Sequence, residues 1–93
     1  MARDEHLFID LRHRVVLLDN KTLNLSRMEY LVLELLVQRA GAVVPRLILL
    51  VLTRAIDMYI RRLQRRLGKY AGLYIERVVG IGYRFRPAFL PRE

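Results

Sequence analysis

The chain has 93 residues, of which 54% are hydrophobic, and carries a formal net charge of +8 at pH 7. This length and apolar content predict a single folded domain over residues 1–93, and the charge favours a polyanionic partner such as nucleic acid or an anionic membrane surface. The sequence contains no cysteine, which excludes disulfides, thiolate metal sites and cysteine nucleophiles, and no apolar run reaches the ~20 residues needed to cross a membrane.

Three short segments, LFIDL, RVVLL and KTLNL, occupy most of residues 7–25. Arg12-His13 and Asp19-Asn20 separate them and are typical of tight turns. The pattern predicts an antiparallel meander with one face on the core. No residue pattern here indicates a function.

The first predicted helix covers residues 26–40. Ser26 and Glu29 form an S-x-x-E capping box, which satisfies two backbone donors at a helix start. This spacing favours a capping role for Glu29 over that of a catalytic acid. Gly41 is expected to end the helix just past its last turn.

A short strand is predicted at residues 42–44, and Pro45 suits the first turn of a second helix over residues 46–52. The RLILLVL run is apolar almost all round, which predicts burial on more than one side. The alternative is that part of this surface meets another protein chain, because an exposed apolar patch promotes aggregation.

The third predicted helix covers residues 53–67 and is expected to end near residues 69–72. Thr53 is a suitable N-cap, and Asp57 falls in the first turn, where negative charge favours the helix dipole. At 3.6 residues per turn, one stripe of the helix is apolar and is predicted to pack into the core. Its members are Ile56, Ile60, Leu63 and Leu67.

The opposite side of this helix is basic. Asp57 provides its only negative charge, and like-charged pairs such as Arg61–Arg65 repel each other at i,i+4 spacing. An ordinary solvated face usually mixes glutamate with lysine, so this composition favours phosphate binding. The residues on this side are Arg54, Met58, Arg61, Arg62, Arg65 and Lys69, with Arg66 beside them.

Residues 73–86 predict two strands joined at residues 80–82, where both glycines are expected to allow positive φ. Tyr83 and Phe85 fall on one side of the second strand, and Arg84 and Arg86 on the other. Arg84 is therefore expected to point away from the core, close to the hairpin tip. Residues 87–93 show no sign of further structure.

Together these elements predict an α+β winged helix-turn-helix with an N-terminal antiparallel sheet, a three-helix core and a C-terminal β-hairpin wing. In such a fold the third helix enters the major groove of DNA. A wing arginine is suited to a narrow minor groove.

Three ordered motifs, LNLSRMEYLVLELLVQRAGAVVPR, RAIDMYIRRLQRRL and IERVVGIGYRF, resemble the DNA-binding effector domain of OmpR/PhoB-type response regulators. The resemblance extends over about residues 7–85. It implies that the third helix faces DNA, that Arg84 approaches the minor groove and that Arg46 lies near a phosphate. The third-helix residues implied to face DNA are Arg54, Asp57, Met58, Arg61, Arg62 and Arg65.

The sequence departs from this family at Gln64, Val79 and Ile81, where other residues are usual. Only Leu52 and Thr53 separate the second predicted helix from Arg54, whereas the family has a longer stretch with a tryptophan that touches RNA polymerase. A polymerase contact is therefore not favoured. The receiver domain with its phosphorylatable aspartate is also missing from this sequence.

The leading interpretation is sequence-specific binding of double-stranded DNA by a bacterial-type, cytoplasmic transcriptional regulator, with Lys69 among the DNA contacts. The alternative is a winged-helix protein-interaction or dimerisation module that has lost DNA binding. A homodimer is compatible with either. His6 and His13 lack a nearby nucleophile or metal-ligand spacing, so no catalytic residue, metal, cofactor or small-molecule substrate is expected. The apolar face of the third predicted helix is needed for the core of the domain, so no membrane partner is expected.

Overall fold

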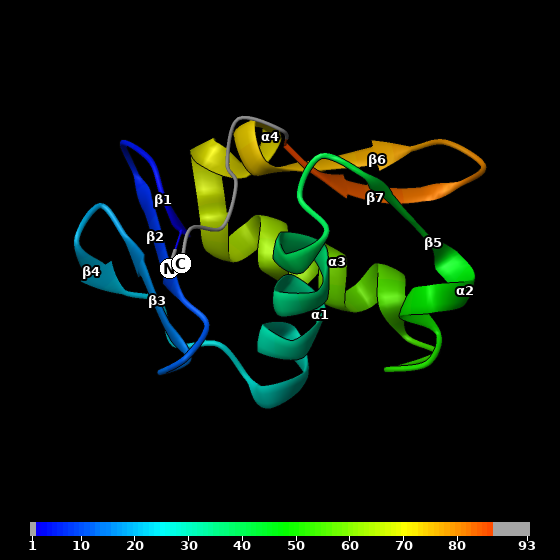
Figure 1. Ribbon diagram of the computed structural model, residues 1–93, viewed down its shortest axis with the longest axis horizontal. Helices are drawn as coiled ribbons and strands as arrows, with labels where there is room; N and C mark the ends of the chain where they lie inside the picture. The colour runs from blue at the N-terminus through cyan, green and yellow to red at the C-terminus, as the bar shows by residue number, and fades with distance from the viewer. Residues whose placement is uncertain (1, 87–93) are drawn as a thin grey trace.

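The computed structural model describes residues 2–86, which form two antiparallel sheets and a helical core between them (Figure 1). One sheet has the order β1-β2-β3-β4, and the other has the order β5-β7-β6. The predicted N-terminal sheet, helical core and C-terminal hairpin are confirmed. Residues 87–93, which were expected to end the domain, lie outside the described residues.

The N-terminal sheet is the predicted meander of β2 (Leu7–Asp10), β3 (Val15–Leu18) and β4 (Lys21–Thr22), to which β1 (Ala2–Arg3) adds a strand that was not predicted. Leu7 and Ile9 are buried and alternate with half-buried residues, as period-two packing requires. Asp19 and Asn20 have φ of 50° and 66°, which is typical of the tightest hairpin turns.

Helix α1 (Arg27–Gln38) begins at the predicted capping box. The Ser26 hydroxyl accepts from the Glu29 N–H at 3.2 Å, and the Glu29 carboxylate accepts from the Ser26 N–H at 2.9 Å. The helix ends at Gln38, and Gly41 follows with φ 92°. The Gly41 N–H donates to the Phe85 carbonyl at 2.8 Å, which ties the end of α1 to the C-terminal sheet.

Helix α2 (Arg46–Leu49) follows β5 (Val43–Pro45) and is shorter than predicted. Leu49 is fully buried, but Leu47 and Val51 are 76% and 83% exposed, so burial on more than one side is wrong. Only one side of residues 46–52 packs against the core. Because helices depend on such packing for most of their stability, the helical structure is limited to a single turn. The link to the next helix, residues 50–55, is correspondingly longer than expected.

Helix α3 (Ile56–Leu67) packs against α1. Thr53 is not its N-cap; its hydroxyl accepts from the Ala55 N–H, ahead of the helix. The helix ends earlier than predicted because Gly68 has φ 58°, and the chain continues as η1 (Gly68–Tyr70) and α4 (Ala71–Tyr74). The predicted apolar stripe is confirmed, since Ile56, Ile60, Leu63 and Leu67 are all buried.

The wing consists of β6 (Ile75–Val78), β7 (Gly82–Phe85) and the turn of residues 79–81 between them. Leu73 and Tyr74, predicted in the first strand, lie in α4 instead. Gly80 has φ 79°, as expected for the turn. Gly82 has no positive φ; a Cβ there would lie 2.0 Å from the Val44 carbonyl oxygen, so glycine is needed for the close approach of β5 and β7.

We expect Gly82→Ala to lower the free energy of unfolding by about 1–3 kcal/mol or more, because the added methyl group collides with backbone. Gly72→Ala is the matched control, since a Cβ at Gly72 meets nothing within 4 Å. Its change should stay within about 1 kcal/mol, on the stabilising side. Urea denaturation measures both, and equal stability of the two variants would contradict the close approach.

Candidate nucleic-acid interface

The exposed side of α3 carries a continuous set of cations. Because the apolar stripe is buried, the arginines between its members face solvent, while Met58, Tyr59 and Gln64 are half-buried. Within residues 2–86, none of Arg54, Arg61 and Arg65 forms an ion pair with a carboxylate. We name this surface the arginine face; its exposed members are Arg61, Arg62 and Arg65 of α3, Arg54 just before the helix and Lys69 in η1.

Two of these cations lie over aromatic rings. The Arg62 guanidinium is 5.5 Å from the centre of the Tyr59 ring, and the Lys69 ammonium is 5.2 Å from that of Tyr70. Such contacts hold a cation in place and leave its charge available to a ligand. Met58, also predicted to face DNA, is half-buried.

A hollow of about 470 Å³ lies where the start of α1 meets α3, lined by Ser26, Glu29, Arg62, Arg65 and Arg66. Arg66 was not among the predicted site residues, although it lies one helical turn after Arg62. Its guanidinium is 3.7 Å from the carboxylate of the buried Glu29. Three guanidinium groups on the rim of one hollow give it a positive potential suited to an anion.

Asp57 connects three elements at the start of α3. Its Oδ1 accepts a hydrogen bond from Arg46 Nη1 at 2.7 Å and another from the Tyr83 hydroxyl at 2.6 Å. The Tyr83 hydrogen bond and then the Arg46 guanidinium lower the pKa of the Asp57 carboxyl. We name these three residues the Asp57 cluster; it joins α2, α3 and β7.

Arg46 and Asp57 were both predicted to contact DNA. In the structure they bond to each other instead. Tyr83 was predicted only as a core residue. Its hydroxyl could not be assigned from the strand pattern, because the partner lies 26 residues away in sequence. Burial and then the Asp57 carboxylate raise the pKa of Tyr83, so the hydroxyl remains a donor at neutral pH.

Arg84 points away from the core as predicted, but its expected place near the hairpin tip is wrong. It lies opposite Glu76, whereas the last pair before the turn is Val78 with Gly82. Arg84 Nε donates to the Glu76 carboxylate at 2.9 Å, and its Nη2 donates to the same oxygen. Arg86 Nη1 lies 3.8 Å from that oxygen. The alternation of side chains along a strand predicts which face Arg84 lies on. It does not predict that Glu76 lies opposite Arg84 on the neighbouring strand.

The wing cation that sequence reasoning missed is Arg77. It is exposed and pairs across the hairpin with Tyr83, so both side chains leave the same face of the sheet. That face also turns toward the start of α3, where Tyr83 meets Asp57. The period-two spacing of Ile75, Arg77 and Val79 could have predicted that Arg77 lies on the same face of the hairpin as Tyr83.

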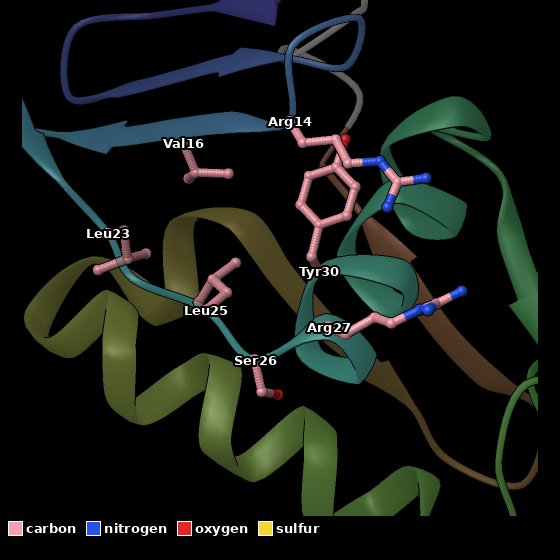
Figure 2. Close-up of a pocket in the computed structure, with 7 residues that line it drawn as sticks. All are labelled: Arg14, Val16, Leu23, Leu25, Ser26, Arg27 and Tyr30. Carbon is pink, nitrogen blue, oxygen red and sulfur yellow. The ribbon is translucent and has the colours of Figure 1, made fainter.

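A second hollow, of about 340 Å³, lies between β3, residues 23–26 and the start of α1 (Figure 2). Leu23 and Leu25 lie on one side of it, and the Arg14 guanidinium lies 5.6 Å from the centre of the Tyr30 ring. Figure 2 shows the guanidinium groups of Arg14 and Arg27 extending away from the leucines. The positive charges of Arg14 and Arg27 therefore do not lie beside the apolar side chains of this hollow.

Residues 20–85 match the family described as "Transcriptional regulatory protein, C terminal". The chain belongs to this family, whose members of OmpR/PhoB type regulate transcription and are not enzymes. No curated protein matches the chain significantly in sequence. In the described part of the chain no helix is long and apolar enough to cross a membrane.

Solved structures of this family share the fold. The Klebsiella pneumoniae RstA DNA-binding domain, in complex with RstA box, is 28% identical with a TM-score of 0.80, covering 92% of this chain and 97% of that chain. The DNA-binding domain of CpxR from E. coli is 28% identical with a TM-score of 0.79, covering 95% and 98%. The Thermotoga maritima OmpR/PhoB homolog DrrB is 29% identical with a TM-score of 0.79; the match covers 91% of this chain and 44% of DrrB. The predicted winged-helix fold is therefore confirmed.

We expect Asp57→Asn to destabilise the domain at pH 7, because it removes the charge that accepts from Arg46 and Tyr83. The folded-state pKa of Asp57 lies below the ordinary value of 3.8, so its stabilisation is present above that pH and is lost as the pH falls through the lowered pKa. Urea denaturation at pH 7 and near pH 3 should show a difference between wild type and variant that shrinks at the lower pH.

Tyr83→Phe is the companion variant, since it removes the hydroxyl and keeps the ring in the core. It should weaken the effect of Asp57→Asn in a double-mutant cycle. Additive effects of the two substitutions, or a difference that does not depend on pH, would contradict a coupled Asp57 cluster.

Proposed function

We propose that the domain binds specific sequences of double-stranded DNA as part of a transcriptional regulator, with α3 in the major groove and the wing at an adjacent minor groove. The observation that carries this proposal is the arginine face, whose cations are exposed while the opposite stripe of α3 is buried. A polyanion supplies the negative charge that the arginine face lacks within the domain.

The geometry of α3 suits a major groove, which is about 12 Å wide and admits a helix. Arginine side chains from such a helix can grip guanine O6 and N7 in bidentate fashion or contact phosphates. We assign these mixed roles to Arg54, Arg61, Arg62, Arg65 and Lys69. Met58 is suited to the methyl group of thymine.

The hollow between α1 and α3 is a candidate phosphate site of this interface. Arg62 and Arg65 line it from the arginine face, and Arg66 adds a third guanidinium. Contacts with phosphates fix the position of a protein on the duplex and carry no sequence information directly. Arg66 therefore joins the residues we propose to position α3.

Arg46, Asp57 and Arg84 have different proposed roles from those implied by the family resemblance. Arg46 and Asp57 bond to each other, which supports a role in holding the wing relative to α3. Arg84 is paired with Glu76 on the outer face of the wing, so Arg77 is better suited to a DNA phosphate.

The RstA structure is a complex with RstA box, and this supports duplex DNA as the partner of the present chain. A bacterial-type regulator meets DNA in the cytoplasm, and we propose that location.

A protein-interaction module is the second candidate, favoured by the exposed side chains of α2 and its following turn. Leu47, Leu50 and Val51 are 76%, 39% and 83% exposed. This surface is compatible with DNA binding, because most of the arginine face lies on α3, a different helix. Loss of DNA binding is not supported, because Arg54, Arg61 and Arg65 form no ion pair with a carboxylate in the described part of the chain.

Charge reversal by Arg62→Glu should weaken binding to a duplex selected from a random pool by roughly a hundredfold or more, since it removes one contact and adds repulsion. For wild type, neutralising six to eight phosphates would give a slope of log K against log salt of about −5 to −7. Fluorescence anisotropy at several salt concentrations measures both quantities.

Lys21→Glu is the control, because it makes the same change of charge at an exposed residue of β4 in the other sheet. It should lower affinity far less than Arg62→Glu. Equal losses in the two variants would indicate a general effect of net charge and would overturn the assignment of α3.

A further inference from the structure

We infer that the wing tip, residues 79–81, contacts the minor groove through the apolar side chains of Val79 and Ile81 rather than through an arginine. The inference rests on the proposed DNA binding and adds to it the chemistry by which the wing contributes affinity. It assigns a DNA-contact role to two residues that charge-based reasoning passes over.

The wing tip is apolar and open to solvent. Val79 is 82% exposed and Ile81 is 54% exposed. Both lie beyond the last ladder pair, Val78 with Gly82, and Gly80 between them has φ 79°. In the described part of the chain the turn thus leaves most of the Val79 side chain and about half of the Ile81 side chain open to solvent.

The wing tip is connected to the start of α3. The Ile81 carbonyl accepts the Arg46 N–H at 3.2 Å. Arg46 in turn bonds to Asp57, which also accepts from Tyr83 of β7. With α3 in a major groove, these contacts leave the wing tip beside the same duplex, at the groove that borders the start of the helix.

Charge favours DNA over a second copy of this chain as the occupant. Residues 42–56 and 77–86 contain no Asp or Glu. The exposed cations of these segments are Arg46, Arg54 and Arg77. Arg46 is paired with Asp57, and among the described residues Arg54 and Arg77 form no ion pair, so the segments that adjoin the tip keep a net positive charge. A second copy would bring the same net charge of +8, whereas a minor groove combines phosphates at its edges with apolar sugar surfaces on its walls.

An apolar contact has a distinct signature in salt. A cation that neutralises a phosphate releases counterions, so its contribution falls as salt rises. Burial of valine and isoleucine surface displaces water and releases no counterion. The wing tip should therefore add affinity without changing the slope of log K against log salt.

The test uses the full chain and duplexes selected from a random pool. Val79→Ala should lower affinity by roughly tenfold, the effect of losing about two buried methylene equivalents, with the salt slope unchanged. Val79→Arg should make the slope steeper by about 0.9, because it adds one phosphate contact. Leu73→Ala is the control: Leu73 is 52% exposed but lies in α4, and its loss should leave binding unchanged.

A change in the DNA identifies the groove. Inosine in place of guanine removes the 2-amino group from the minor groove and leaves the major-groove pattern intact. At the base pairs beside the wing, this replacement should raise wild-type affinity and should have a smaller effect with Val79→Ala. Circular dichroism verifies that each variant is folded.

The possible failures are distinguishable. If Arg62→Glu abolishes binding while Val79→Ala and Ile81→Ala bind as wild type, the wing inference is overturned and the proposed function stands. If wild type shows no salt-sensitive binding to any duplex, both are overturned. If Val79→Ala instead abolishes a concentration-dependent self-association seen by sedimentation and leaves DNA affinity unchanged, the wing tip is a protein contact and the inference is wrong.

Discussion

The position of the arginine face depends on the burial of four side chains on the other side of α3. Ile56, Ile60, Leu63 and Leu67 are each at most 2% exposed. Rotating the helix to turn its guanidinium groups inward would expose these side chains and bury charges, and both changes are strongly unfavourable. The repulsion among the arginines is small by comparison, a few tenths of a kcal/mol per pair. Core packing therefore holds a charged surface outward that ion pairing within the domain does not neutralise.

The Asp57 cluster adds a second constraint, on the angle between α3 and the wing. Arg46, Asp57 and Tyr83 come from α2, α3 and β7, and they meet through a single carboxylate oxygen. Two elements that we propose to occupy neighbouring grooves are thus connected at one point. A carboxylate on a surface meant for phosphates is otherwise unfavourable, and its two hydrogen-bond donors account for its presence there.

Local features of the fold could be predicted from the sequence because their causes are local. The capping box of Ser26 and Glu29, the buried stripe of α3 and the alternation of Tyr83 and Phe85 depend on spacing within one element. Both α2 and α3 end earlier than the sequence predicts. Contact with the core decides the end of α2, and the positive φ of Gly68 decides the end of α3.

The partners of charged side chains could not be predicted, because they come from other segments. Glu76 meets Arg84 across a ladder, and Asp57 meets Tyr83 across the domain. As a result the arginine face is predicted correctly as an exposed surface, whereas Arg84 is wrongly expected at the hairpin tip. Arg66 is noted beside the basic side but not among the DNA contacts, and Arg77 is missed. Charge patterns along the chain identify a candidate surface; the fold decides which of its charges are free.

The most direct measurement is a map of backbone amide chemical shifts for the isotope-labelled chain as a selected duplex is added. We expect the largest changes in residues 54–66 and 77–83, with small changes in β1–β4. Largest changes in the N-terminal sheet, or changes confined to α2 while residues 54–66 stay unaffected, would contradict binding through the arginine face.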